Sequence, residues 1–302
     1  MADPHRSSAL TSQGWVLLLL LGALWGAVYP LTALLLQDFP PTMVVFARTF
    51  LGALVLAPLA LAVGGARDLR SQPFDLVLAA LVQATVPLLL LTFGQQEVPS
   101  SVAGIIVAGQ PIFVALLAAA FDPGDRPGVL AATGIGLGFL GVALLLGVEP
   151  AGQRVPLLPA LTVIAAAASY AAGAVYIHRR LPNASPVTVA GSAMTFSCLA
   201  VLPVIAPALP GTVASMAGTR TLLAVLCLGV VATGFGLALY YRLIRDIGPR
   251  RATLAGYLAP AFAVLYSLPL GEPLTAVKVA GLLLVVTGSA LASRRTRALP
   301  GT

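Results

Sequence analysis

The sequence has little charge. Only 9% of its 302 residues are Asp, Glu, Lys or Arg, and 59% are hydrophobic, whereas a soluble domain carries about 25% charged residues. A water-facing surface cannot be built from this composition, which excludes a soluble globular protein. The net charge of +7 does not indicate nucleic acid as a partner, because the basic residues lie in short connectors rather than along one helical face. The partner that this composition predicts is the lipid bilayer.

Cysteine and histidine are also scarce. Cys198 and Cys227 each stand alone inside an apolar run, which is typical of cysteine used as a small hydrophobe rather than in a disulfide or a thiolate site. His5 and His178 lie in connectors, far from any cluster with ligand spacing, so we expect no metal and no cofactor. No intramembrane His or Asp is present to activate a serine, and we therefore expect no enzyme.

What the sequence does contain is a series of continuous apolar runs. Each approaches the roughly 20 residues that a helix needs to cross the hydrocarbon core, whereas strands of a membrane barrel would alternate apolar and polar residues. The first run lacks the cleavage site of a signal peptide, so we expect it to be retained. We predict an all-α, polytopic membrane protein. Its ten transmembrane helices are expected to start near Val16, Met43, Phe74, Val98, Gly128, Leu157, Val187, Leu222, Ala252 and Leu274.

The placement of charge predicts an orientation, because each added or missing span would swap the sides of all later connectors. With ten spans and the amino terminus in the cytoplasm, most of the 17 Lys and Arg residues also face the cytoplasm. Arg154, Arg220 and Lys278 remain on the far side, and Arg48 lies inside the second span. This bias predicts that both termini are cytoplasmic.

The chain also resembles itself at an offset near 147 residues, as when Pro41 matches Pro186 and Gly134 matches Gly281. We predict two five-helix repeats, residues 1–148 and 149–302, that together form one membrane transporter domain. Because five is odd, the second repeat enters the membrane from the opposite side, which is the construction of many secondary transporters. Channels share such duplications, so the repeat alone indicates a fold rather than a function.

Several short motifs follow one another in order along the chain. They are Leu24-Trp25-Gly26 through Pro30, Pro41 with Arg48, Pro111 echoed by Pro260, and Gly271-Glu272-Pro273-Leu274-Thr275. With the ten spans and the duplication, this order resembles the EamA-type members of the drug/metabolite transporter superfamily over nearly the whole chain. Two positions depart from the family's pattern, since Asp125 stands where Glu is usual and Ala193 stands opposite Arg48 in the repeat. Within the superfamily the resemblance is to bacterial exporters of amino acids, including aromatic ones.

Aromatic residues interrupt the apolar spans at matching depths. Trp25 and Tyr29 are four residues apart and share one helix face, and Tyr170 stands at the position of Trp25 in the second repeat. Packing or interfacial anchoring is the structural alternative, but anchors belong near the headgroups and Trp25 lies well inside its span. We expect these rings to line a substrate cavity.

Polar residues beside prolines point to the same cavity. Gln83, Gln110 and Tyr257 place hydrogen-bonding groups inside apolar spans, where an unpaired polar group is costly. Hydrogen bonding between helices is the alternative to substrate binding. Each proline removes a backbone hydrogen bond and leaves a carbonyl that must face protein or water. The predicted helix breaks or hinges are Pro30, Pro87, Pro111 and Pro260.

Arg48 is the one clearly intramembrane charge in the sequence. Ionisable residues inside the membrane are candidates for function, and we include Arg48 among the substrate-binding residues as a contact for a carboxylate. It lies close to Thr42 at the start of its span, so its side chain could instead snorkel to the far surface. A third possibility is a gating pair with Asp38.

Glycines predict where helices approach one another. Gly134 and Gly138 have the spacing that permits close helix packing, and Gly281 and Gly288 match them in part in the second half. We expect a structural role for these glycines. The expected oligomeric state is a monomer or a weak homodimer through helices five and ten.

These patterns predict an inner-membrane exporter of small metabolites that works by alternating access between its halves. Neutral or aromatic amino acids are the cargo that the resemblance implies. Other metabolites or drugs, such as nucleosides, and a non-transporting scaffold or channel are the alternatives. All ten acids lie in connectors or near helix ends, so we expect no tight coupling to protons or sodium. Glu97 and Glu272 are the competing candidates for a proton site.

Overall fold

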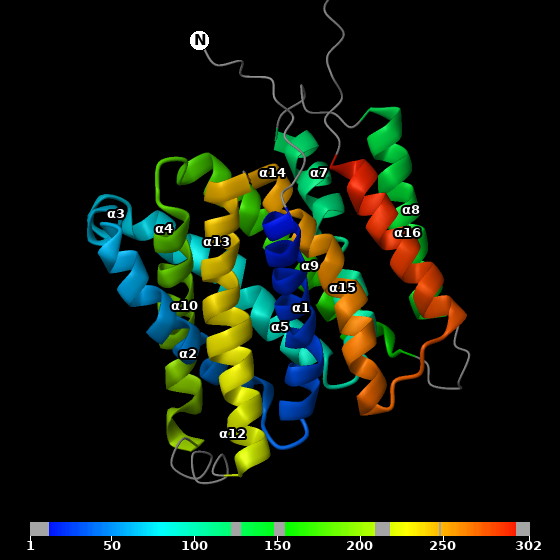
Figure 1. Ribbon diagram of the computed structural model, residues 1–302, viewed down its shortest axis with the longest axis horizontal. Coiled ribbons are helices and arrows are strands. Elements are labelled where there is room, and N and C mark those ends of the chain that lie inside the picture. The colour runs from blue at the N-terminus through cyan, green and yellow to red at the C-terminus, as the bar shows by residue number, and fades with distance from the viewer. Residues whose placement is uncertain (1–11, 122–127, 148–154, 209–217, 248, 294–302) are drawn as a thin grey trace, which may run out of the picture.

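The computed structural model describes residues 12–121, 128–147, 155–208, 218–247 and 249–293. Within these ranges the chain forms helices and no strand, which confirms the all-α prediction. Figure 1 shows the helices packed side by side, with α8 (Val129–Gly147) and α16 (Ala276–Ala292) at one edge of the molecule. α2 (Pro41–Ala62) and α10 (Pro186–Ile205) lie toward the other edge.

The first half of the chain forms five apolar helical stretches, two of which are composite. In chain order its elements are α1 (Ser12–Leu35), α2, the short α3 (Gly65–Ser71), α4 (Pro73–Ala80) with π-helix η1 (Leu81–Thr85) and α5 (Val86–Gly94), α6 (Ser100–Val107) with α7 (Gln110–Phe121), and α8.

The second half also forms five apolar helical stretches, of which the third is composite as in the first half. Its elements are α9 (Leu157–Arg180), α10 with the 3₁₀ turn η3 (Ala206–Ala208), α12 (Thr219–Leu226) with π-helix η4 (Cys227–Phe235) and α13 (Gly236–Ile247), the short α14 (Pro249–Ala252), α15 (Leu254–Ser267) with the 3₁₀ turn η5 (Leu268–Leu270), and α16.

Eight helical stretches among the described residues are long and apolar enough to cross a bilayer, and Leu254–Leu270 and Ala276–Ala292 are shorter apolar helices. All ten begin within a few residues of the predicted starts. The positions of the apolar helices therefore follow from the sequence. The number that crosses the membrane, and the inverted relation of the halves, stay predictions.

Prolines and glycines set several helix ends. Pro41, Pro73 and Pro186 stand in the first turns of α2, α4 and α10, where a backbone N–H has no partner within the helix and its loss costs little. Gly64 and Gly271 turn the chain with φ of 86° and 82°, a left-handed conformation that glycine adopts without a steric penalty.

Helices of the first half pack mainly against helices of the second half. α1 packs on α15, α2 on α10, α5 and α7 on α9, and α8 on α16. Glycine permits one of the closest contacts, because a Cβ at Gly22 of α1 would lie only 2.6 Å from Leu258 Cβ of α15. The principal helix contacts therefore join the halves to each other.

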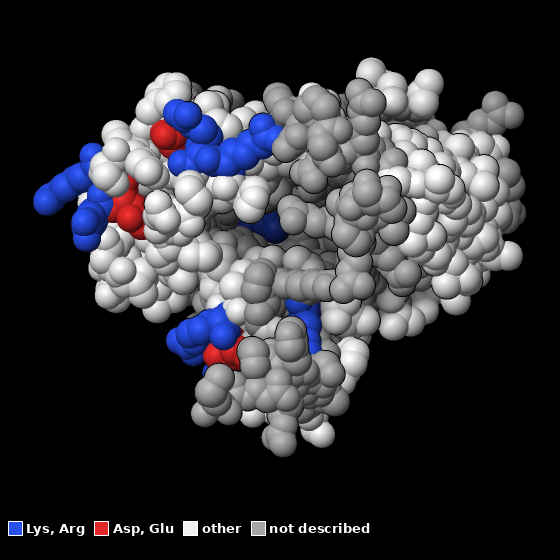
Figure 2. Space-filling model, turned by 90° about the horizontal axis from the view of Figure 1, so that it is seen from above, with Lys and Arg blue, Asp and Glu red and all other residues white. Residues whose placement is uncertain are grey.

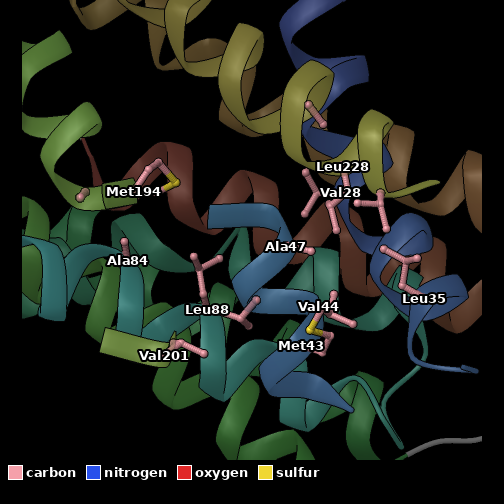
Figure 3. Packing of buried hydrophobic residues seen from close by; sticks show 14 of the residues in the cluster. Val28, Leu35, Met43, Val44, Ala47, Ala84, Leu88, Met194, Val201 and Leu228 are labelled. Carbon is pink, nitrogen blue, oxygen red and sulfur yellow. The ribbon is translucent and has the colours of Figure 1, made fainter. Parts of the chain in front are cut away.

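A large apolar cluster lies where α2, α5, α10 and η4 meet (Figure 3). Val28, Met43 and Met194 belong to it, whereas large apolar side chains such as Leu140 and Leu283 stay exposed on the outside. Lipid is as apolar as this cluster, so close packing rather than exclusion from water holds membrane helices together. The exposed leucines are suited to contact with lipid.

α8 and α16 contact each other through glycine. A Cβ on Gly134 would lie 2.6 Å from the carbonyl oxygen of Gly288, and a Cβ on Gly288 would lie 2.6 Å from the backbone nitrogen of Gly138. This is the close approach that the glycine spacing predicted. The glycine faces of helices five and ten thus cover each other within one chain, and a homodimer through these helices would have to use their other faces.

We predict that Gly288→Val destabilises the fold, because the added side chain would collide with the backbone of α8. Overpacking of this kind costs about 1–3 kcal/mol of unfolding free energy, and the apparent melting temperature of the detergent-purified protein should fall. Gly136→Val is the matched control, since a Cβ at Gly136 meets nothing within 4 Å. Equal melting temperatures for the two variants would contradict the tight contact between α8 and α16.

Candidate functional site

Arg48 points into the protein rather than toward the far surface. Its Nε donates a hydrogen bond to Thr233 Oγ1 at 2.9 Å, and Thr233 belongs to η4 of the opposite half. None of the ion pairs among the described residues involves Arg48, so the gating pair with Asp38 is not formed in this conformation. A partly buried arginine inside a span is therefore held by a neutral hydroxyl.

Two tyrosines lie within electrostatic range of Arg48. Tyr29 of α1 and Tyr170 of α9 lie near the guanidinium, and Tyr29 lies near Tyr170. The Tyr29 side chain is buried, and a Cβ at Gly104 of α6 would lie 3.2 Å from its ring. The structure thus brings together three of the predicted site residues from three separate helices.

Trp25 extends this group by one helical turn along α1. Its ring centroid lies 5.1 Å from that of Tyr240, and Tyr240 lies 5.7 Å from Tyr241. Both tyrosines belong to α13. The sequence did not mark them as site residues because Arg242 follows them directly, and rings beside a basic residue are typical of interfacial anchors. We call these six residues the central cluster: Trp25, Tyr29, Arg48, Tyr170, Tyr240 and Tyr241.

Gln83 lies beside the central cluster. Its side chain is pressed against Gly173 of α9, which is three residues from Tyr170 and therefore on the same helix face. Nearby, Ser169 Oγ donates to the carbonyl of Val82 at 2.8 Å. The Gln83 Oε1 atom is buried without a hydrogen-bond partner among the described residues. An unpartnered buried acceptor requires an explanation, and a donor on a ligand is one.

Gln110 and Tyr257 are not joined to the central cluster by any hydrogen bond or ring contact among the described residues. Gln110 begins α7 after a break in the helix. The Tyr257 hydroxyl lies 3.4 Å from the carbonyl of Ser289, which is in α16, and 3.2 Å from Oγ of Ser293, the residue that follows this helix. For Tyr257 the structure places the side chain in a contact between helices, the alternative weighed above.

The four prolines behave differently from one another. Pro87 is the second residue of α5, just after the π-helix η1. Pro111 follows a break at residues 108–109, where the carbonyl of Ala108 accepts a hydrogen bond from Ser289 Oγ at 2.8 Å. In contrast, α1 continues through Pro30 and α15 continues through Pro260. No helix break is present at these two in this conformation, because an α-helix can lose one backbone hydrogen bond inside a packed bundle without ending. A hinge at either proline stays a prediction.

Glu272 makes a separate polar contact outside the apolar helices. It accepts hydrogen bonds from the backbone N and the hydroxyl of Ser100, both at 2.6 Å, from the backbone N of Ser101 at 3.1 Å, and from the Ser101 hydroxyl. Lys278 Nζ lies 3.5 Å from its Oε2. Burial raises the pKa of Glu272, but the four hydrogen bonds outweigh burial and hold the pKa below its ordinary value. The side chain is a carboxylate at neutral pH.

Figure 2 views the end of the molecule at which α1 begins. Basic side chains gather on this face, where exposed arginines lie on α3, α9 and α13, among them Arg67, Arg180 and Arg245. The face is hollowed near its centre, with Lys or Arg atoms visible deep in the hollow. The described residues contain no group of three or more His, Cys, Asp or Glu side chains that could hold a metal ion.

Residues 13–147 and 157–294 match the model of the EamA-like transporter family. The chain belongs to this family. It is accordingly a membrane transporter, and its family and relatives are transporters rather than enzymes.

Individual relatives are similar over most of their length. The uncharacterized transporter YvbV of Bacillus subtilis is 26% identical over 94% of this chain and 92% of the relative. The uncharacterized inner membrane transporter YedA of Escherichia coli K12 is 27% identical, over 82% and 79%. A protein named probable amino-acid metabolite efflux pump, also from Escherichia coli K12, is 25% identical over 90% and 92%. A protein of known crystal structure shares the fold, with a TM-score of 0.62 at 22% identity over 93% of this chain and 96% of that protein.

We predict that Glu272→Gln lowers the apparent melting temperature at pH 7. Because the folded-state pKa lies below the ordinary value of 4.5, the stability contributed by the carboxylate is present above that pH and is lost as the pH falls below it. Loss of charged hydrogen bonds costs about 1.5–3 kcal/mol. The difference in melting temperature between Glu272→Gln and the parent should therefore be smaller at pH 4 than at pH 7. Glu97→Gln is the control variant. A difference that does not depend on pH would contradict the ionised contact.

Proposed function

We propose that this protein is an inner-membrane exporter of neutral or aromatic amino acids that works by alternating access between residues 1–148 and 149–302. The observation that carries the proposal is Arg48, an intramembrane cation with aromatic neighbours and no acidic partner among the described residues. A charge at membrane depth is expensive unless it is paired. The carboxylate of an amino acid would supply the missing partner.

The other groups of the central cluster suit the rest of an amino acid. The rings of Trp25, Tyr240 and Tyr241 lie next to one another and could stack on an aromatic side chain or hold an ammonium group by cation–π contact. The unpartnered Gln83 Oε1 would accept a hydrogen bond from the ammonium. The name of the relative in Escherichia coli, a probable amino-acid metabolite efflux pump, supports the same cargo.

The pairing of helices supports ten spans arranged as two inverted repeats. Two pairs join unlike stretches: α1, the first, packs on α15, the ninth, and α9, the sixth, packs on α7 of the fourth. Two pairs join equivalent stretches: α2 packs on α10, and α8 packs on α16. A twofold axis in the membrane plane would exchange the first two pairs with each other and map each of the last two onto itself. The family model also matches one segment in each half.

The orientation follows from the same arrangement. Exposed arginines gather at the end of the molecule where α1 begins (Figure 2), and this end would be cytoplasmic. The hollow in that face would then open toward the cytoplasm, as an exporter requires in order to load. An inner-membrane location is in keeping with YedA. We propose a monomer or a weak homodimer as the transporting unit.

We predict that proteoliposomes loaded with unlabelled L-phenylalanine take up labelled L-phenylalanine by counterflow. Arg48→Gln should reduce this exchange about tenfold or more, because a charged contact to the carboxylate is lost. Arg220→Gln, which removes an exposed arginine at the start of α12, is the control and should exchange like the parent. Exchange of nucleosides but not of amino acids would move the cargo to another class. No exchange of either would indicate that the cargo is another metabolite or a drug.

We also predict that an imposed pH gradient does not drive uphill accumulation. Asp75 and Asp246 are the acids within the apolar stretches among the described residues, and both lie near a stretch end. Glu272 is held as a carboxylate by its hydrogen bonds, which disfavours it as a proton carrier. Downhill uptake should be unchanged by the gradient. Accumulation that a protonophore abolishes would overturn this prediction, and its loss in Glu97→Gln or Glu272→Gln would identify the acid.

A further inference from the structure

Two threonines occupy equivalent places in the two halves. Thr85 lies in η1 and Thr233 in η4, 148 positions apart in the sequence. Each donates its hydroxyl to the carbonyl five residues earlier, Thr85 to Ala80 at 3.3 Å and Thr233 to Leu228 at 2.8 Å. π-Helical turns of this kind occur frequently at functional sites. In each half the π-turn thus fixes the direction of a buried hydroxyl.

The partners of the two hydroxyls differ. Thr85 Oγ1 lies 2.8 Å from Ser197 Oγ of α10, whereas Thr233 Oγ1 accepts the hydrogen bond from Arg48 of α2. The counterpart of Ser197 at the repeat offset is Gly52, and a Cβ there would lie 3.2 Å from Thr233 Cγ2. Because glycine offers no hydroxyl, the acceptor on Thr233 is left for Arg48. One half therefore has a neutral pair where the other has a charged one.

We propose that Thr233 is a positioning residue that holds the Arg48 guanidinium by its Nε, so that the two Nη groups are presented to a substrate carboxylate. This inference rests on the proposed function and adds a residue of the second half to the anion site. The hydroxyl of Thr233 gives its hydrogen to Leu228 and can act toward Arg48 only as an acceptor. With Nε engaged, the pair of Nη groups remains, and this pair can bind a carboxylate in a bidentate manner.

The orientation matters because arginine has a long, flexible side chain. A guanidinium that is free to rotate loses conformational entropy on each binding event, whereas one already held does not. The same contact links α2 of the first half to η4 of the second half. A ligand on Arg48 would therefore bind at the boundary between the halves.

The test measures binding of L-phenylalanine and of phenethylamine, which has the ring and the ammonium but no carboxylate. Trp15 and Trp25 are the two tryptophans of the chain, so fluorescence in a Trp15→Phe background reports on Trp25 in the central cluster. Thr233→Val should weaken L-phenylalanine binding about tenfold and change phenethylamine binding by less than about twofold. Thr233→Ser, which keeps the hydroxyl, should bind L-phenylalanine like the parent. Thr85→Val is the matched control from the other half, and it should not weaken binding of L-phenylalanine more than binding of phenethylamine.

A double-mutant cycle separates positioning from packing. If Thr233 acts through Arg48, then Thr233→Val has no further effect in an Arg48→Gln background. Equal weakening of both ligands, or an undiminished effect in that background, would overturn the proposal while leaving Arg48 as the anion site. If Arg48→Gln itself leaves L-phenylalanine binding unchanged, the proposed function fails.

A second measurement needs no substrate. In protein labelled with ¹⁵N-arginine, the Nε–H signal of Arg48, identified by its loss in Arg48→Gln, should exchange slowly with water. Exchange should stay slow in Thr233→Ser and become fast in Thr233→Val. Unchanged slow exchange in Thr233→Val would overturn the positioning role whatever the cargo is.

Discussion

Inside hydrocarbon, every backbone carbonyl that a helix leaves unpaired must find a donor from the protein, and the site of this transporter depends on that constraint. Where the fourth stretch breaks before Pro111, Ser289 donates to the carbonyl of Ala108. Where the third stretch widens into η1, Ser169 donates to Val82 and Thr85 donates to Ala80. Each irregularity is thus covered by a specific side chain. The irregular segments face other helices for this reason, and they carry polar groups to the interior.

The same constraint explains why the halves are joined so closely. Helices without a driving force from water hold together through close packing, and glycine provides it at α1 with α15 and at α8 with α16. A polar contact adds to this at Glu272, which ties the turn before α16 to the start of α6. The central cluster lies among these joined helices, and its residues come from α1, α2, α9 and α13. Its geometry is therefore set by contacts between the halves.

Much of this was accessible from the sequence, for identifiable reasons. Apolar length predicted the ten helical stretches, and the spacing of Trp25 and Tyr29 predicted their shared face. The depth of Arg48 marked it as a candidate for function. Sequence could not reveal which neighbour each face meets, so Thr233 went unnoticed. For the same reason Tyr257 was assigned to the cavity, although its hydroxyl lies 3.4 Å from the carbonyl of Ser289 in α16. Tyr240 and Tyr241 were missed because they stand next to Arg242, where rings commonly anchor at the interface.

The positive charge of Arg48 would also affect how the membrane potential acts on a transporter with the proposed site. A zwitterionic amino acid brings no net charge, so the site carries one positive charge both empty and loaded. An electric field, worth about 2.3 kcal/mol per elementary charge for each 100 mV, then acts equally on both forms and favours neither. A simple carboxylate would neutralise the site and an amine would double its charge, so voltage would distinguish those cargoes from an amino acid. With no acidic partner for Arg48 among the described residues, a zwitterionic cargo would leave the net charge of the site unchanged when it binds.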